Sequence, residues 1–302
     1  MRLYTFEREG TQHLGVEHKG RLADLPAAYQ ALVKAQGATR FDMPSDMLSF
    51  IRMGIAATNA AKQVLSFLDG APAASGIYFD MDKVKLHAPL PRPGKILCSG
   101  INYASHAEDN PNAIMPTKPM VGFAKMPSNV IGPFDSIIYP KLTQQLDWEV
   151  ELAAIIGETI PREVTENEVV QYVAGYTIFH DVSARDVQNE SLILGKNFDT
   201  FAPMGPCMVT TDELTDPYTL QLKTLVNGVV KQNANNRDWL FPLPKMLCRV
   251  ANVMTLYPGD VVTMGTPGGT GLKDGKYLKV GDVVRMEIDG IGHIENRIVA
   301  PA

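Results

Sequence analysis

Short apolar runs separated by polar turn residues at the start of the chain are typical of strands. Residues 3–6 are apolar and aromatic, and residues 13–17 form a second short run of the same kind. The pairs Glu9-Gly10 and Lys19-Gly20 are typical of turns and bracket the second run. The opening residues are therefore predicted to form two short strands.

The next stretch has the spacing of helices. Ser45-Asp46 precedes apolar residues at positions 47, 48, 50 and 51, which makes it a candidate N-terminal cap. Asn59 precedes a second apolar set at 60, 64, 65 and 68, and Gly70 is a candidate stop. Residues 1–90 are thus predicted to form a small α/β domain of two or three strands plus helices.

Three prolines between residues 89 and 93 interrupt both patterns. Proline cannot continue a helix or occupy a central strand, so we place a domain boundary near residue 90. The alternative is an internal loop of a single domain. Residues 91–302 are predicted to hold strands at 95–98, 148–156, 176–180, 207–210, 222–226, 261–264 and 283–288, with helices at 164–173 and 244–253. We expect an α+β chain that is mainly β and lacks an alternating βαβ sheet.

Composition narrows the classes of protein. The 302 residues are 45% hydrophobic with a formal net charge of −5, which suits a soluble globular protein and argues against nucleic-acid binding. No apolar run is long enough for a membrane helix, and the start lacks a signal-peptide core. Cys98, Cys207 and Cys248 form neither a disulfide framework nor a zinc motif, so we expect buried, inert thiols in a cytoplasmic protein.

One acidic segment carries the first candidate chemistry. In a strand, Asp147, Glu149 and Glu151 share one face, while Trp148 and its apolar successors share the other. Stacked carboxylates beside a core repel each other, and a bound cation relieves that repulsion. Oxygen-only ligands favour Mg²⁺, Mn²⁺ or Ca²⁺ over zinc. The spacing alone leaves two interpretations, a metal site or a solvated acidic edge.

Other candidate groups lie elsewhere in the sequence. Asp181 ends an apolar strand, where it is either a ligand or a helix cap. His106 is followed closely by Glu108 and Asp109, which suits either a base with an orienting acid or a surface histidine. Lys196 lies between turn residues. The glycine-rich residues 265–271 follow a strand and lack a P-loop ending, so they are a turn or a close backbone approach to a ligand.

Taken in order, these segments resemble the fumarylacetoacetate hydrolase family over about residues 94–302. The resemblance rests on motifs that follow one another along the chain: Ile101-Asn102-Tyr103 with His106, Asp147-x-Glu149-x-Glu151, Asp181 with Ser183-Ala184-Arg185-Asp186-x-Gln188, Gly195-Lys196-x-Phe198-Asp199, Arg237-Asp238-Trp239, Pro258-Gly259-Asp260 and Gly265-Thr266-Pro267-x-Gly269.

This resemblance implies a mixed β-sandwich roll in the larger domain and a homodimer. It also implies a divalent metal, Mg²⁺ or Mn²⁺ with Ca²⁺ as a further option, and a role for each matching residue. The implied metal ligands are Glu149, Glu151 and Asp181; the implied catalytic groups are His106 and Lys196; the implied substrate contacts are Tyr103, Arg185, Gln188 and Thr266. Many relatives carry Glu three residues after the histidine. Here Asp109 holds that place and Glu108 precedes it, so either acid is a candidate partner of His106.

The expected reaction is hydrolysis of a C–C bond in a 1,3-dicarbonyl 2-oxo acid, of the acylpyruvate or fumarylpyruvate type, through a metal-stabilised enolate. His106 would activate the water, and Lys196 with Gln188 would face the developing oxyanion or a carboxylate. The alternatives are a decarboxylase or keto–enol isomerase for oxaloacetate or a related 2-oxo acid, and a metal-binding protein without turnover. Residues 110–117 are a candidate lid that sets the pocket's length.

Overall fold

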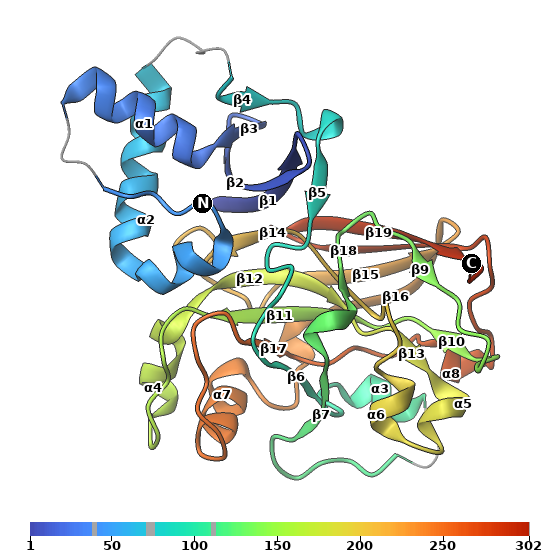
Figure 1. The fold of residues 1–302 in the computed structure, drawn as a ribbon. Helices are drawn as coiled ribbons and strands as arrows, with labels where there is room; N and C mark the ends of the chain where they lie inside the picture. Colours follow the sequence, from blue (N-terminus) through green and yellow to red (C-terminus); the bar gives the residue numbers. More distant parts are fainter. Residues whose placement is uncertain (38–40, 71–75, 110–112, 302) are drawn as a thin grey trace.

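The computed structural model describes residues 1–37, 41–70, 76–109 and 113–301, and strands dominate it (Figure 1). The strands are β1 (Arg2–Arg8), β2 (Thr11–His18), β3 (Arg21–Asp24), β4 (Tyr78–Phe79), β5 (Lys85–His87), β6 (Ile96–Ser99), β7 (Val121–Lys125), β8 (Val130–Ile131), β9 (Ile137–Ile138), β10 (Leu146–Asp147), β11 (Val150–Ile156), β12 (Val173–His180), β13 (Ser183–Ala184), β14 (Ala202–Thr210), β15 (Gln221–Val226), β16 (Val229–Asn235), β17 (Val261–Thr263), β18 (Val283–Ile288) and β19 (Gly292–Val299). The α-helices are α1 (Leu25–Gln36), α2 (Met47–Gly70), α3 (Ala104–Glu108), α4 (Glu166–Val169), α5 (Arg185–Gln188), α6 (Leu192–Gly195), α7 (Leu243–Ala251) and α8 (Gly271–Asp274).

Two sheets pack against each other. The larger has 12 strands along the path β4-β3-β2-β1-β14-β12-β11-β17-β6-β7, with β5 on β1 and β8 on β14. The smaller has the order β16-β15-β18-β19-β9, and β10 pairs with β13 alone. Leu152 and Ile178 of the large sheet share one apolar cluster with Met286 and Ile294 of the small sheet, which forms the core of a sandwich. Most pairs are antiparallel, but β17–β6, β14–β8 and β19–β9 are parallel. The predicted α+β, mainly β class with a mixed β-sandwich is confirmed.

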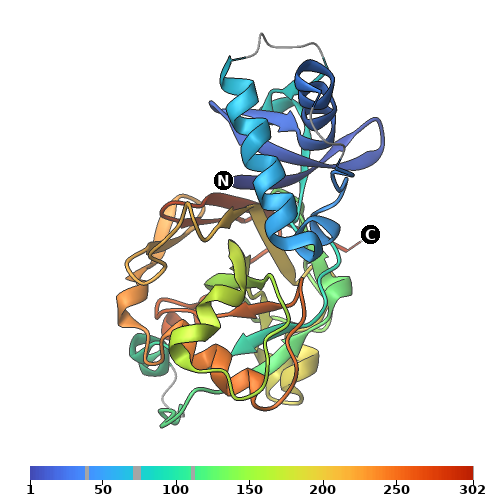
Figure 2. The same ribbon diagram turned by 90° about the vertical axis from the view of Figure 1, so that its left-hand side faces the viewer.

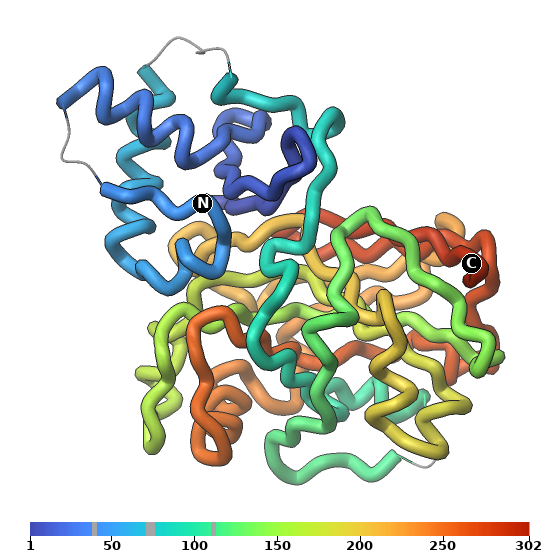
Figure 3. The backbone as a smooth tube through the Cα atoms, in the orientation of Figure 1, coloured from blue at the N-terminus to red at the C-terminus, as the bar shows by residue number. Residues whose placement is uncertain are grey.

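A second apolar cluster lies on the other face of the large sheet. Helices α1 and α2 pack there over the N-terminal strands, as Figure 2 shows. Leu14 and Phe50 of this part share the cluster with Ile155 and Phe179 of the central strands. The sheet runs through both parts of the chain, because β1 pairs with β14 at Leu3↔Met208. The tube in Figure 3 shows the connection through β5 into the lower part. The division near residue 90 stays a prediction.

The local expectations meet three outcomes. Both N-terminal turns are confirmed, since Glu9 and Lys19 each adopt a φ of 50° before a glycine. The cap at Asp46 is confirmed, because its carboxylate accepts the Ser49 N–H at 2.9 Å. The expected cap at Asn59 is wrong: it lies inside α2, whose interruption falls instead at Gly54, with φ of 56° and ψ of −130°. Glycine tolerates that backbone, and asparagine inside the helix is not needed as a cap.

Two further findings concern the cysteines and the search for a membrane-spanning helix. All three cysteines are free, and Cys98 and Cys207 are buried as expected, but Cys248 is partly exposed. Within the described residues, no helix has both the length and the apolar content that a bilayer crossing requires.

Candidate metal centre and active site

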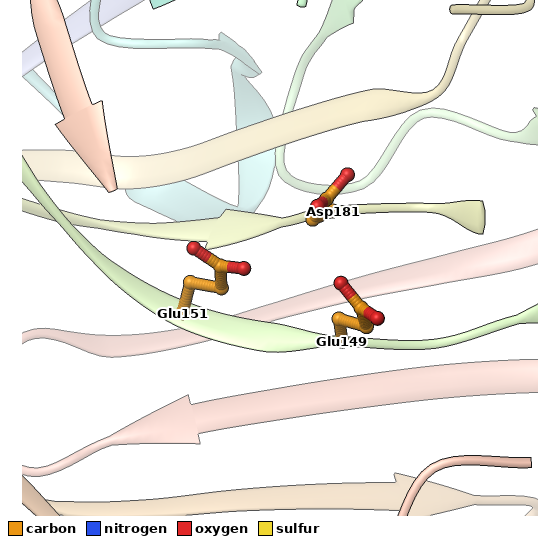
Figure 4. Close-up of side chains that lie close together, drawn as sticks. All are labelled: Glu149, Glu151 and Asp181. Atoms are coloured by element: carbon orange, nitrogen blue, oxygen red, sulfur yellow. The ribbon is translucent and has the colours of Figure 1, made fainter. Parts of the chain in front are cut away.

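Three carboxylates meet where β11 and β12 lie side by side. Glu149 and Glu151 flank the first residue of β11, and Asp181 follows the last residue of β12. The Asp181 N–H donates to the Glu149 carbonyl at 3.0 Å, which continues the ladder and places both side chains on the same face. One oxygen from each carboxylate lies within 4.8 Å of the others. Figure 4 shows the three side chains close together.

Burial and neighbouring charges set the ionisation of these acids. Burial raises the pKa of Glu151 to about 8, and the charges of Asp181 and Glu149 add to the effect. Burial also raises the pKa of Asp181, against the opposing influence of Lys125 and Lys196. At Glu149 burial acts in the same direction, but Arg185 and Lys196 outweigh it and hold the pKa well below its usual value. Glu151 is therefore the acid with the least compensation.

Two buried lysines form ion pairs with Glu149 and Asp181 of the triad. Lys196 follows α6, and its Nζ donates to Glu149 Oε2 and to Asp181 Oδ2, each at 2.7 Å. Lys125 ends β7, and its Nζ lies 2.7 Å from Asp181 Oδ1 and donates to the carbonyls of Val182 and Phe201. Sequence reasoning missed Lys125. The only feature of the sequence that points to Lys125 is its position as the last and only charged residue of strand β7.

A guanidinium completes the charged cluster. Arg185 Nε donates to Asp147 Oδ2 at 2.8 Å, and its Nη2 donates to Glu149 Oε1. Although Asp147 was expected to share a strand face with Glu149, it lies in β10 and also accepts the Gly271 N–H at 2.6 Å. Asp147 thus positions Arg185 and stays outside the triad.

The residues present suit a hard divalent cation. The triad offers only oxygen atoms, which is the donor set that Mg²⁺, Mn²⁺ and Ca²⁺ prefer. Glu151 Oε2 accepts one backbone N–H, from Gly265 at 2.9 Å, and Glu151 forms no ion pair with any residue described in the structure. Gly265 has φ of 81°, a conformation that favours glycine, so the turn itself delivers this donor. An uncompensated buried acid beside two others is the position where a cation would bind.

His106 approaches the triad from α3. Its Nε2 lies 3.9 Å from Glu149 Oε1, and its Nδ1 is buried with no hydrogen-bond partner among the described residues. Burial lowers the pKa of His106, although the Glu149 charge partly opposes the shift. The imidazole is therefore held neutral, which is the form that accepts a proton.

Neither candidate acid hydrogen-bonds to His106 in this structure. Asp109 Oδ2 instead accepts the N–H groups of Gly269 at 2.6 Å and Thr270 at 3.2 Å, which ties the end of α3 to the glycine-rich loop. Glu108 is exposed. The pairing of His106 with either acid stays a prediction. In this structure Asp109 instead holds the glycine-rich loop in place.

A cavity of about 380 Å³ opens beside the triad, lined by its Glu149 and Glu151 but not by Asp181. Most of the predicted site residues line it: His106, Glu149, Glu151, Arg185, Gln188, Lys196 and Thr266. Tyr103 lies outside this lining, since its ring is fully buried and its hydroxyl donates to Asn236 at 2.8 Å. Its expected contact with substrate is therefore not seen here. The candidate lid at 110–117 begins outside the described residues, which exclude 110–112, and the nearby Met120 lines the cavity.

Comparison with known proteins agrees with this geometry. The family described as fumarylacetoacetate (FAA) hydrolase C-terminal matches residues 95–299. Oxaloacetate tautomerase Fahd2a of Rattus norvegicus is 39% identical over 85% of this chain and 80% of its own length. Oxaloacetate tautomerase FAHD2A of Bos taurus is 37% identical over 99% of this chain and 92% of its own.

Solved structures extend the likeness to the whole fold. Fumarylacetoacetate hydrolase of Exiguobacterium antarcticum is 36% identical with a TM-score of 0.81, and the match covers 100% of both chains. Maleylpyruvate hydrolase of Sphingobium sp. SYK-6, solved with manganese(II) and pyruvate, is 32% identical with a TM-score of 0.78, again over 100% of both chains. The chain therefore belongs to the fumarylacetoacetate hydrolase family.

Proposed function

We propose that this protein is a divalent-metal-dependent enzyme that cleaves a C–C bond in 1,3-dicarbonyl 2-oxo acids by way of their enolates. The observation that carries the proposal is the buried triad of Glu149, Glu151 and Asp181, with a neutral His106 at its edge. A metal held by these three carboxylates would supply Lewis acidity, which stabilises negative charge on a substrate oxygen.

Mg²⁺ and Mn²⁺ are the proposed ions, with Ca²⁺ as a further option. All three accept carboxylate oxygens, and the site offers no sulfur or nitrogen ligand in the triad. The related maleylpyruvate hydrolase was solved with manganese(II), which supports Mn²⁺ as the first ion to test.

The protein groups divide the remaining work. His106 would take a proton from water, which adds to the distal carbonyl of the substrate. The C–C bond then breaks, its electron pair stays with the 2-oxo acid as an enolate, and a proton returns to that carbon while the distal part leaves as a carboxylic acid. Lys196 keeps Glu149 ionised and lines the cavity, where its ammonium would also attract the substrate carboxylate. Thr266 also lines the cavity, and its hydroxyl accepts a hydrogen bond from Gln232 Nε2 at 2.8 Å.

The alternative candidate function is keto–enol isomerisation of oxaloacetate. Decarboxylation of oxaloacetate would pass through the same enolate. The buried His106 Nδ1 without an acid partner favours isomerisation, because moving a proton between carbon and oxygen requires no activated water. The rat and bovine relatives named oxaloacetate tautomerase support the same choice.

The test is an activity panel on chelator-treated protein. Mg²⁺ or Mn²⁺ should restore turnover of acetylpyruvate, followed as loss of enol absorbance, or of oxaloacetate, followed as approach to keto–enol equilibrium and as CO₂ release. Acid release identifies the hydrolase, faster equilibration identifies the isomerase, and CO₂ identifies the decarboxylase. Full activity in excess chelator contradicts the proposal. A folded, metal-bound protein that is inactive on the whole panel supports instead the metal-binding protein without turnover.

We also propose that the protein is a homodimer in the cytoplasm and that it acts in the breakdown of aromatic-ring cleavage products. The family resemblance supports the first, and the related maleylpyruvate hydrolase supports the last. The curated relatives carry mitochondrial names, so location needs its own test. Light scattering after size exclusion measures the assembly, and cell fractionation measures the location.

A further inference from the structure

A buried glutamine links the two sheets beside the metal triad. Gln232 lies in β16 of the small sheet, and its side chain is fully buried. Its carboxamide contacts strand β11 of the large sheet at Val150 and the glycine-rich segment at Thr266 and Pro267. Val150 is the residue between the two glutamates of the triad, and Thr266 lines the cavity. One side chain therefore connects the strand that carries the acids to the wall of the cavity.

The carboxamide of Gln232 uses all of its hydrogen-bonding capacity. Its Oε1 accepts from the Val150 N–H at 3.1 Å and from Thr224 Oγ1 at 2.8 Å. Its Nε2 donates to Thr266 Oγ1 and to the Pro267 carbonyl, each at 2.8 Å. A carboxamide has two acceptor sites on oxygen and two N–H groups, so none of them is left without a partner.

Two backbone groups determine which way round the carboxamide lies. A backbone N–H can only donate and a carbonyl can only accept, so Val150 and Pro267 have fixed roles. If the carboxamide were turned over, its NH₂ group would face the Val150 N–H and its oxygen would face the Pro267 carbonyl. Both buried hydrogen bonds would be lost, which is costly in a site closed to water. The NH₂ group of Gln232 is therefore directed to Thr266.

The Val150 N–H is available for this contact because of the pairing of β11. The Glu149 carbonyl accepts from β12, and alternation along a strand turns the Val150 N–H to the opposite edge. On that edge the register with β17 covers residues 153–155 and does not reach Val150. Gln232 Oε1 thus takes the place that the carbonyl of a neighbouring strand would have.

The direction of the NH₂ group sets the role of the Thr266 hydroxyl. Because Gln232 Nε2 donates to Thr266 Oγ1, the hydroxyl accepts on that side and keeps its own proton for another partner. Thr266 donates to no side chain or carbonyl in the described part of the chain, and it lines the cavity. The acceptor that remains is an oxygen of a molecule bound in the cavity.

We propose that Gln232 is a positioning residue that orients the Thr266 hydroxyl as a hydrogen-bond donor to an oxygen of the bound 2-oxo acid. The inference rests on the proposed function, because it assumes such an acid in the cavity. An unrestrained hydroxyl can rotate between donating and accepting. The fixed NH₂ group removes that choice, so the donor is in place before negative charge develops on the substrate oxygen. Gln232 does not line the cavity and acts through Thr266.

A double-mutant cycle on oxalate binding tests this role. Oxalate is an inert dianion with the two-oxygen arrangement of a 2-oxo acid enolate, and calorimetry measures its affinity for protein saturated with Mn²⁺. Thr266→Val removes the hydroxyl and should weaken oxalate binding by about tenfold. Gln232→Met removes the NH₂ group at similar length and should weaken it by about fivefold. In the Thr266→Val background, Gln232→Met should change the affinity by less than about twofold, because no hydroxyl remains to be oriented.

Two further variants separate orientation from stability. Gln221→Met changes a glutamine of the neighbouring strand β15 whose carboxamide bonds to Asn233 at the surface, so oxalate affinity should stay within about twofold of wild type. Thr224→Val removes one of the two donors to Gln232 Oε1 and decides the matter if Gln232→Met does not fold. It should weaken oxalate binding by about two- to threefold when Thr266 is present, and have no effect together with Thr266→Val.

Two results overturn the positioning role. One is equal weakening by Gln232→Met in both backgrounds, which is what a purely structural role predicts, and the other is unchanged oxalate affinity in Gln232→Met. The same two results for Thr224→Val overturn it if Gln232→Met does not fold, and so does a wild type that binds no oxalate. None of these depends on turnover. Inactivity on the substrate panel with an intact coupling removes the proposed function alone, whereas metal-dependent turnover with additive effects removes this proposal alone.

Discussion

Strands β11 and β12 carry two regions of opposite character on one hydrogen-bonded ladder. At one end lie Glu149, Glu151 and Asp181, and at the other end β11 continues through residues 152–156 without a charge. Every residue of β11 is buried, and so are Glu149 and Asp181, although Glu149 and Glu151 also line the cavity. The apolar region gains free energy from its burial, whereas burial of the acids costs free energy until cations compensate them. The comparison teaches that the apolar end is the scaffold that holds the charged end together.

Glu149→Ala is the change with the largest expected effect, and it acts on the charged end. It removes the acid that Lys196 and Arg185 both contact, so metal binding and turnover should be lost together, by about a thousandfold or more in kcat/KM. Calorimetry with Mn²⁺ and the substrate panel measure the two losses. Glu190→Ala, at an exposed acid, is the control. Normal metal affinity in Glu149→Ala would show that the triad is not the metal site.

Leu152→Ala tests the apolar end of the same strand. Leu152 is fully buried in the core between the two sheets, so its truncation should reduce the free energy of unfolding by about 2–5 kcal/mol. Metal affinity of the folded protein should stay within about twofold of wild type, because no ligand is changed. Denaturant titration and calorimetry provide the measurements. Leu142→Ala, whose side chain is 77% exposed, should cost under about 0.5 kcal/mol.

His106→Ala separates metal binding from proton transfer within the charged end. The imidazole lies beside Glu149 without belonging to the triad, so Mn²⁺ should still bind. Hydrolysis of acetylpyruvate should fall by about a hundredfold or more. Decarboxylation of oxaloacetate should survive better, because it needs no activated water. Unchanged hydrolysis would remove His106 from the role of base.

A graded pH dependence is expected that only the charged end should show. Burial raises the pKa of Glu151 to about 8, so metal must displace a proton below that pH. Mn²⁺ affinity should therefore rise up to about tenfold per pH unit between pH 6 and 8, and then level off. His106→Ala should keep this slope. A flat profile would mean that Glu151 is already ionised in the metal-free protein.

The same shift predicts a change in stability with a definite sign. Folded Glu151 keeps its proton up to pH about 8, whereas the unfolded chain loses it near the ordinary value of 4.5. Between these two values the folded state binds more protons, so the metal-free protein should become less stable as pH rises. Thermal unfolding in chelator at pH 6 and pH 8 measures the difference, and added Mn²⁺ should reduce it.

Sequence reasoning succeeded where neighbours along the chain decide the outcome. Alternation placed Glu149 and Glu151 on one strand face, and the structure agrees. It failed where the partner lies far away in sequence. Asp109 meets Gly269 across 160 residues, and Lys125 meets Asp181 only because separate strands converge. Asp147 left the predicted strand because β10 pairs with β13 instead. No local pattern encodes these long-range contacts.

The contact between β1 and β14 has a consequence for any attempt to produce residues 91–302 alone. Cutting the chain there would strip β14 of its partner at Arg2↔Val209 and Leu3↔Met208, and would leave hydrogen-bonding groups of that strand open to solvent. An unpaired strand edge of this kind can form hydrogen bonds with a strand of another molecule. The shortened protein should therefore polymerise, which would make strand β1 a cover against self-association.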